Sequence, residues 1–236
     1  MLDAHASAAT LARARRLLST QGYALLPEAG FTDGRTIDRT AVLGISGLFG
    51  RPSSRDGGTL IWRVQPQSTD PRETFSQRSG EALLHTDAAY HADPEPLFAL
   101  FCVRPAADGG LTRLLGAADA VAGLDSETLE QLRCSMWRWV PPRVFGSQRD
   151  AARPVLGPDG TIRWRPDNLD VPEPLARVAA AFHDHVEAHP RLLQFPLPPD
   201  SVLLCDNRRV LHGRTTFTDS RRLLLRVRLW EEEEVQ

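Results

Sequence analysis

Two candidate ligands that lie two residues apart, with a third far along the chain, constrain the fold more than any other feature. His85 and Asp87 follow the apolar pair Leu83-Leu84, and His212 stands far downstream. Residues i and i+2 of an extended strand point to the same face, so His85 and Asp87 can offer an imidazole nitrogen and a carboxylate oxygen to one point in space. His212 can complete that set only in a fold that brings distant strands together.

The His-x-Asp triplet carries little weight by itself. Two imidazoles and one carboxylate leave the other positions of an octahedral ion open, an arrangement typical of non-haem Fe(II) sites. The same triplet also occurs by chance, and a lone example is better explained as a turn cap or a surface pair. The metal interpretation therefore depends on the motifs around it.

The first accompanying motif is Gly109-Gly110-Leu111-Thr112. Two glycines let the backbone turn sharply or approach a ligand closely, and Thr112 then offers a hydroxyl at the head of an apolar stretch. A plain turn between two strands explains the glycines equally well when they are considered alone.

The second accompanying motif is the alternating segment 222–230. One face carries Leu223, Leu225, Val227 and Leu229, and the other carries Arg222, Leu224, Arg226, Arg228 and Trp230. On a solvated face these arginines would be ordinary surface residues. In a barrel interior they need anionic partners, because an unpaired buried guanidinium is costly, and Arg binds carboxylates in a bidentate manner.

Taken in order, these motifs resemble the Fe(II)/2-oxoglutarate dioxygenases of the taurine dioxygenase and clavaminate synthase type. The set consists of His85-Thr86-Asp87, Gly109-Gly110-Leu111-Thr112, Asp206-Asn207-Arg208 with His212, and Arg222-Leu223-Leu224-Leu225-Arg226. Each motif is weak alone, but the ordered set is specific. The resemblance covers residues 62–230.

The resemblance implies a role for each matching residue. His85, Asp87 and His212 are the expected ligands of Fe(II), with 2-oxoglutarate as cosubstrate and O₂ as oxidant. Thr112 and Arg222 are the expected partners of the distal carboxylate of 2-oxoglutarate.

The second arginine of the motif has two implied roles. Arg226 is expected either to share the cosubstrate or to meet a carboxylate of the prime substrate, with Arg228 beyond it on the same face. The choice between Arg222 and Arg226 as the clamp for 2-oxoglutarate stays open.

Composition sets the remaining bounds. The 236 residues suffice for one catalytic domain, residues 1–236, and would be short for two. The net charge of −2 gives no reason to expect nucleic acid or an anionic membrane as a partner. Three cysteines without paired spacing, no segment long enough to span a bilayer and no apolar leader predict a cytoplasmic protein. The oligomeric state cannot be inferred.

The pattern of elements predicts a mainly β fold with flanking helices, and the resemblance implies a double-stranded β-helix of jelly-roll type. The expected helices cover residues 6–21, 33–43, 125–133 and 172–189. The expected strands cover residues 23–26, 60–64, 97–103, 137–140, 161–165, 201–205 and 222–230.

Residues 50–80 are rich in Gly, Pro, Ser, Arg and Gln and directly precede the triplet. Such a region is well placed to cover an active site, with Trp62, Gln65 and Phe75 as expected substrate contacts. A disordered surface loop is the alternative.

The resemblance implies hydroxylation of an unactivated C–H bond, with release of succinate and CO₂. We expect a small substrate that bears a carboxylate, such as an amino acid or a derivative. Two alternatives stay open: the same iron site directing desaturation, epimerisation or cyclisation, or a jelly-roll domain that binds a metal or an organic acid without turnover.

Overall fold

The computed structural model describes residues 8–55, 57–67, 73–142, 144 and 152–231. The strands are β1 (Tyr23–Leu26), β2 (Arg51–Pro52), β3 (Trp62–Val64), β4 (Ala82–His85), β5 (Leu97–Arg104), β6 (Thr112–Gly116), β7 (Leu193–Phe195), β8 (Ser201–Asp206), β9 (Val210–Arg214) and β10 (Leu223–Trp230). The helices are α1 (Ala8–Gln21), α2 (Arg39–Gly47), α3 (Ala117–Val121), α4 (Ser126–Arg133) and α5 (Glu173–Glu187), with short 3₁₀ turns η1 (Phe75–Gln77) and η3 (Pro166–Asn168).

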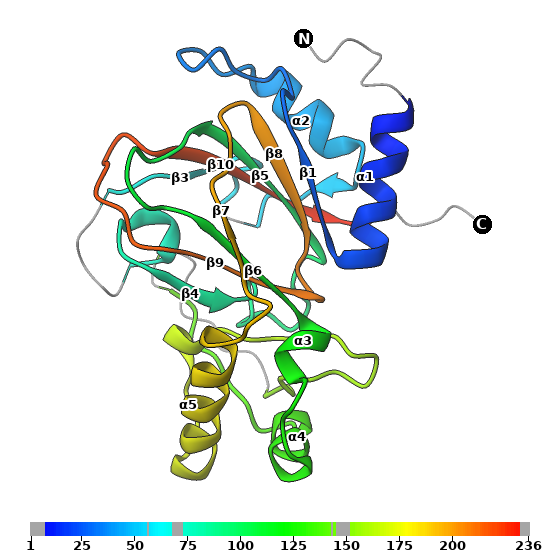
Figure 1. Ribbon diagram of the computed structural model, residues 1–236, viewed down its shortest axis with the longest axis vertical. Coiled ribbons are helices and arrows are strands. Elements are labelled where there is room, and N and C mark those ends of the chain that lie inside the picture. The colour runs from blue at the N-terminus through cyan, green and yellow to red at the C-terminus, as the bar shows by residue number, and fades with distance from the viewer. Residues whose placement is uncertain (1–7, 56, 68–72, 143, 145–151, 232–236) are drawn as a thin grey trace.

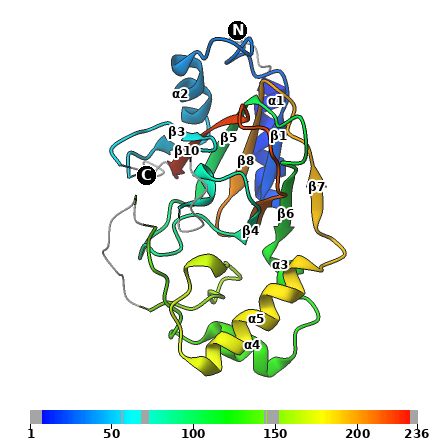
Figure 2. The same cartoon turned by 90° about the vertical axis from the view of Figure 1, so that its left-hand side faces the viewer.

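Two antiparallel sheets face each other, as Figures 1 and 2 show. The larger has the order β1-β8-β5-β10-β2, with β3 also paired to β10, and the smaller has the order β4-β9-β6-β7. Sequence neighbours are split between the sheets, so β8 lies in one and β9 in the other. This arrangement confirms the expected double-stranded β-helix with flanking helices.

Alternation along the strands assigns each side chain to one of three packed layers. On β10 the alternate residues Leu223, Leu225, Val227 and Leu229 pack with α1 and α2, on the outside of the larger sheet. Leu224 points the other way and packs between the sheets with Phe98 of β5 and Leu114 of β6. The barrel interior therefore receives alternate residues from both sheets, the arginines of β10 among them.

A third layer fills the space between the smaller sheet and helices α3, α4 and α5. Leu84, Leu115 and Leu211 face this side and pack with Trp137 and Trp164. Because His85, Gly116 and His212 directly follow these leucines, the same alternation turns both histidines toward the barrel interior. In both ribbon views α4 and α5 lie at one end of the barrel, away from α2.

Three predicted elements were wrong in position or type. The helix expected at 33–43 is replaced by a turn and then α2, because the Asp33 carboxylate accepts the amide protons of Arg35 and Thr36 and Asp38 caps the helix through the amide of Ala41. The strands expected at 137–140 and 161–165 form only isolated β-bridges.

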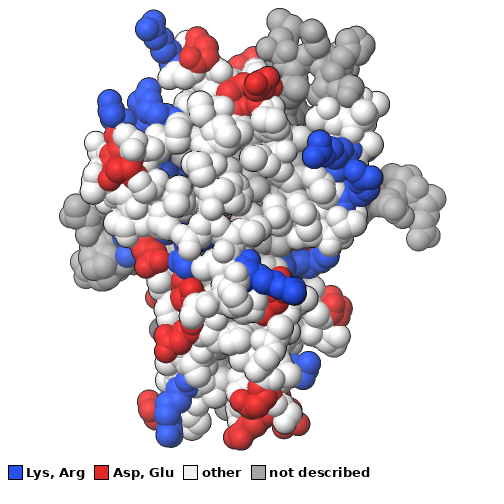
Figure 3. Space-filling model, viewed as in Figure 1, with Lys and Arg blue, Asp and Glu red and all other residues white. Residues whose placement is uncertain are grey.

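No helix in the described part of the chain is long and apolar enough to cross a membrane. Acidic and basic side chains are interspersed over the face shown in Figure 3, in keeping with the near-neutral composition. Residues 56 and 68–72 of the expected covering region lie outside the described residues. The rest of that region supplies β2 and β3, which extend the larger sheet along β10, and η1.

Candidate metal and cosubstrate site

The three predicted metal ligands lie together. His85 ends β4 and stands opposite His212 of β9 in the sheet register, with ring centroids 4.3 Å apart. Oδ1 of Asp87 is 3.9 Å from Nε2 of His85 and 4.0 Å from Nε2 of His212. One ligand atom from each residue lies within 4.8 Å of the others. β4 ends at His85, so strand alternation places the two histidines and does not account for Asp87.

The backbone of Asp87 is held by the side chain of Asn207. The amide of Asp87 donates to Oδ1 of Asn207 at 2.7 Å, and Nδ2 of Asn207 donates to the Asp87 carbonyl at 3.0 Å. The same Nδ2 also donates to the carbonyl of Glu95 at 2.9 Å. Ala88 follows with φ 56°, a left-handed conformation that is uncommon for a residue with a Cβ and is often found at functional sites.

Three arginines surround the buried carboxylate of Asp87. Nη1 of Arg226 donates to Oδ1 at 2.9 Å, Nε of Arg228 lies 3.6 Å from Oδ2, and Nη1 of Arg165 lies 4.0 Å from Oδ1. Burial by itself raises the pKa of Asp87, but the charges of Arg226 and Arg228 outweigh it and hold the pKa below its ordinary value. The carboxylate is therefore ionised and available as a ligand.

Both imidazoles are held in the neutral form that binds metals. Nδ1 of His85 lies 2.7 Å from the carbonyl oxygen of Leu83, so it carries the proton and leaves the Nε2 lone pair toward Asp87. Burial, followed by the charges of His212 and Arg165, lowers the pKa of His85 well below its ordinary value. Burial also lowers the pKa of His212 to about 4.

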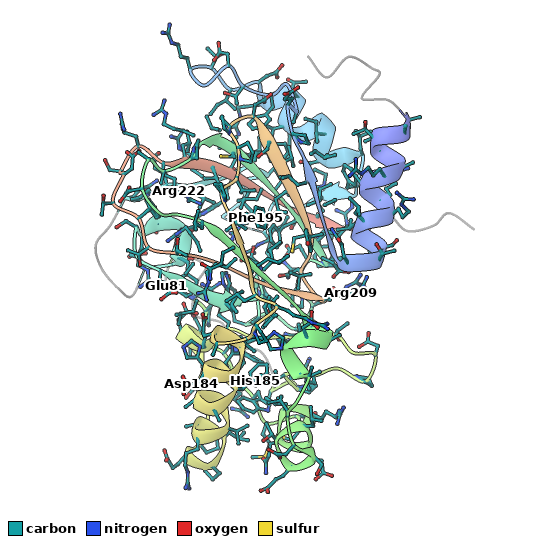
Figure 4. All side chains as sticks on the ribbon, viewed as in Figure 1. Glu81, Asp184, His185, Phe195, Arg209 and Arg222 are labelled. Carbon is teal, nitrogen blue, oxygen red and sulfur yellow. The ribbon has the colours of Figure 1, made fainter. Side chains whose placement is uncertain are left out.

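These properties fit a divalent transition metal. Two neutral imidazole nitrogens and one ionised carboxylate approach a common point, and this donor set is the one that non-haem Fe(II) enzymes use. Within the described chain, no other group of three His, Cys, Asp or Glu side chains is close enough to share an ion. His185, labelled in Figure 4, belongs to α5, which lies on the other side of the smaller sheet from β10.

A cavity of about 70 Å³ adjoins the histidines, and the two residues predicted to bind 2-oxoglutarate belong to its wall. Thr112 and Arg222 both line it and both are buried. Nη1 of Arg222 is buried and has no hydrogen-bond partner in the structure. A carboxylate entering the cavity would supply that partner, so the residues fit a dicarboxylate cosubstrate.

The glycine pair lies beside this guanidinium. Gly109 and Gly110 have φ of 58° and 63°, and a Cβ on Gly109 would meet the carbonyl oxygen of Thr216 at 2.1 Å. A Cβ on Gly110 would lie 3.3 Å from Nε of Arg222. Both explanations of the motif therefore hold together: the glycines form a turn, and that turn passes close to Arg222 (labelled in Figure 4).

The expected substrate contacts are placed unequally. Phe75 lines the cavity, with its ring centroid 4.9 Å from that of His85. Trp62 is adjacent to the cavity wall, since its Nε1 donates to Oγ of Ser76 at 2.9 Å. Gln65 is not among the residues that line the cavity, and its Oε1 accepts a hydrogen bond from Arg63 at 2.8 Å.

The surplus arginines of β10 have anionic partners inside the protein. Arg226 lines the cavity, yet it pairs with Asp87, and Nη1 of Arg228 lies 3.9 Å from Oε2 of the buried Glu95. A substrate carboxylate was expected at these arginines because a barrel interior would otherwise leave them without anions. That reason does not hold, because Asp87 and Glu95 supply the charge.

Sequence reasoning missed four residues at this site: Asn207, Glu95, Arg165 and Arg214. Asn207 belongs to the Asp206-Asn207-Arg208 motif, which was quoted without a role for the amide. Arg214 stands two residues after His212 on β9, so alternation would have placed it in the interior. No local pattern marks Glu95 or Arg165.

A double-stranded β-helix that brings two histidines and an aspartate together beside a cation-lined cavity is typical of non-haem Fe(II) oxygenases that use 2-oxoglutarate. The chain belongs to the taurine catabolism dioxygenase TauD, TfdA family, whose sequence profile matches residues 2–228. The resemblance inferred from the motifs is thereby confirmed.

A curated relative is the L-asparagine oxygenase of Streptomyces coelicolor (strain ATCC BAA-471 / A3(2) / M145), which is 30% identical over 172 residues. The alignment covers 68% of this chain and 50% of that protein, so this chain matches about half the length of the relative.

Solved structures of two oxygenases share the fold. Asparagine oxygenase in complex with Fe(II), 2S,3S-3-hydroxyasparagine and succinate superposes with a TM-score of 0.77 at 22% identity, covering 94% of this chain and 78% of that one. The non-haem iron oxygenase OrfP with Fe, succinate and (3S)-hydroxy-L-Arg gives 0.73 at 19% identity, covering 95% and 81%.

Proposed function

We propose that this protein is an Fe(II)- and 2-oxoglutarate-dependent oxygenase that hydroxylates an unactivated C–H bond of a free amino acid or a close derivative. The observation that carries the proposal is the placement of His85, Asp87 and His212 around one point, beside a cavity in which the buried Nη1 of Arg222 lacks a hydrogen-bond partner. Iron alone would require only the three metal ligands. The cavity with the buried Arg222 fits, in addition, a cosubstrate with a distal carboxylate.

Iron bound together with 2-oxoglutarate and O₂ supplies the oxidising chemistry, with succinate and CO₂ as by-products. The protein supplies binding and orientation. His85 and His212 offer neutral nitrogens, and Asp87 offers a carboxylate that Arg226 and Arg228 keep ionised. Arg222 and Thr112 orient the cosubstrate by its distal carboxylate.

Aromatic rings next to the histidines keep water out of the site. The ring centroid of Phe75 lies 4.9 Å from that of His85, and the ring centroid of Phe98 lies 4.5 Å from that of His212. A dry site protects a reactive oxidant from side reactions and strengthens every charge interaction within it.

The relatives support the substrate class. Asparagine oxygenase and OrfP are recorded with a hydroxylated asparagine and a hydroxylated arginine, which are free amino acids. A cytoplasmic location, one catalytic domain over residues 1–236 and a small-molecule substrate without nucleic acid or membrane partners stay predictions. Binding of a substrate carboxylate by Arg226 or Arg228 also stays a prediction. It is supported by the amino acids recorded with the relatives.

The test is an O₂-dependent succinate-release screen over free amino acids and other small carboxylates, with Fe(II) and 2-oxoglutarate supplied. We expect succinate above the substrate-free rate for at least one amino acid, with a product heavier by one oxygen atom. A product lighter by two hydrogens would favour desaturation or cyclisation. An absence of both iron binding and 2-oxoglutarate binding would contradict the proposal.

A further inference from the structure

The side chain of Arg214 on β9 donates hydrogen bonds to three backbone carbonyls of a neighbouring segment. Its Nη1 donates to the carbonyl of Phe75 at 3.1 Å, and its Nη2 donates to the carbonyls of Arg78 at 2.9 Å and Gly80 at 2.6 Å. The side chain is buried. One guanidinium thus fixes residues 75–80, here called the wall segment, to the strand that carries His212.

The wall segment forms part of the cavity. Phe75 and Ser76 line it, and the ring of Phe75 contacts His85 with a centroid distance of 4.9 Å. The guanidinium of Arg165 lies 5.0 Å from the centroid of the same ring. The position of the wall segment therefore decides how well the iron-facing side of His85 is shielded.

Arg214 also faces Arg222. Both line the cavity, and the described residues that line it include no aspartate or glutamate. Nε of Arg214 and Nη1 of Arg222 are buried without a hydrogen-bond partner in the structure. The guanidinium carbons of Arg214 and Arg222 lie 4.8 Å and 5.0 Å from the centroid of the same ring, that of Phe217, so two like charges are held close together beside the cavity.

We propose that Arg214 couples the binding of 2-oxoglutarate to the ordering of the wall segment. The proposal rests on the proposed function, because it requires the distal carboxylate of the cosubstrate to reach Arg222. A carboxylate there relieves the repulsion between the two guanidiniums. Arg214 then binds the carbonyls of Phe75, Arg78 and Gly80 more firmly, and Phe75 is held against His85. Arg214 is thus a positioning residue that makes the site close better once the cosubstrate is in place.

The test is hydrogen–deuterium exchange of the peptides that cover residues 73–82, in Fe(II)-loaded protein without oxygen. The added ligands are 2-oxoglutarate and 2-oxopentanoate, which has the same chain length and lacks the distal carboxylate. We expect 2-oxoglutarate to slow exchange in the wall segment about tenfold, and 2-oxopentanoate to have little effect. Binding of each ligand is followed independently by the visible absorption of its complex with Fe(II).

Two variants locate the coupling. Arg214→Gln is expected to bind 2-oxoglutarate, more weakly than the wild type, without slowing exchange in the wall segment. The control is Arg209→Gln, which removes an exposed guanidinium that donates to the carbonyl of Ser19 at 2.7 Å and lies outside the cavity. It is expected to behave as the wild type.

Three outcomes would overturn the inference: equal protection by the two ligands in the wild type, no protection by bound 2-oxoglutarate, or undiminished protection in Arg214→Gln. If that variant does not fold, Arg214→Lys replaces it, because an ammonium keeps the charge and loses the fork that reaches three carbonyls. A protein that shows no binding of 2-oxoglutarate at all contradicts the proposed function itself, which separates the two failures.

Discussion

Nη1 of Arg226 donates to Oδ1 of Asp87 at 2.9 Å, and Asp87 is fully buried. The oxygen that accepts this hydrogen bond is also the one nearest to the two histidines. Arg226 therefore sets the orientation of the carboxylate that is expected to bind the metal. Arg226, which the sequence analysis assigned to the cosubstrate or the substrate, thus pairs with Asp87, a candidate metal ligand.

Removal of Asp87 is expected to cost more stability than removal of His212. Asp87→Ala removes the carboxylate that pairs with Arg226 in the interior, and removing one partner of a buried ion pair costs about 3–5 kcal/mol. His212→Ala removes a neutral ring. Both variants should lose Fe(II) binding and turnover, but only Asp87→Ala should unfold at a clearly lower urea concentration than the wild type. Iron binding that survives in His212→Ala would contradict the metal assignment.

Arg226→Ala is expected to lower the affinity for Fe(II) about 10- to 100-fold, because groups that orient a ligand have effects of that size. Metal titration of the apoprotein measures this directly. The same variant also decides the competing role. If Arg226 held a substrate carboxylate, the substitution would remove the preference for a substrate acid over its amide and leave the metal affinity unchanged. Glu95→Gln perturbs Arg228 instead of Arg226, so it should lower the affinity for Fe(II) less than Arg226→Ala does.

Sequence alone could predict which residues of β10 face the interior, because that follows from alternation on a strand. Alternation predicted that Arg222 and Arg226 share one face, and both line the cavity, whereas His212 was expected near His85 only through the family resemblance. Asp87 lies past the end of β4, and its position depends on Asn207 and on arginines that come from β10 and from the segment before η3. Such contacts join residues far apart in the chain and leave no local periodicity.

The pairing of charges was equally hidden from the sequence. Arg228 has Glu95 as a partner because Glu95 lies two residues before β5, and the pairing of β5 with β10 brings it next to Arg228. The prediction of a helix at 33–43 was wrong for a local reason. Asp33 and Asp38 both accept hydrogen bonds from backbone amides, and the hydrophobic spacing did not indicate which of them caps the helix.

The metal-free protein is expected to lose stability as the pH falls below 6.5. The pKa of His212 is lowered from 6.5 to about 4, and that of His85 is also lowered well below its ordinary value, so the unfolded chain takes up protons first. The loss begins near pH 6.5 and, for His212, continues down to about pH 4. Urea denaturation at pH 7.5, 6 and 5 measures it. The variant His212→Gln should show a smaller loss over this range, and an equal loss would assign the effect to other groups.

The clamp for 2-oxoglutarate is expected to be Arg222, and its exposed neighbour Arg221 provides a matched control. The side chain of Arg221 is 71% exposed and pairs with Asp219, whereas Arg222 is buried with Nη1 unpartnered beside Thr112. Arg222→Ala should raise the KM for 2-oxoglutarate about 100-fold, since charge-assisted hydrogen bonds in a dry pocket are lost. Arg221→Ala should leave the KM for 2-oxoglutarate unchanged.

Steady-state succinate release at varied 2-oxoglutarate provides the comparison. 2-Oxopentanoate is a second check, because a cosubstrate without the distal carboxylate should barely distinguish the wild type from Arg222→Ala. If Arg222→Ala keeps the wild-type KM and Arg226→Ala does not, the clamp is Arg226, and the unpartnered Nη1 of Arg222 would need another ligand.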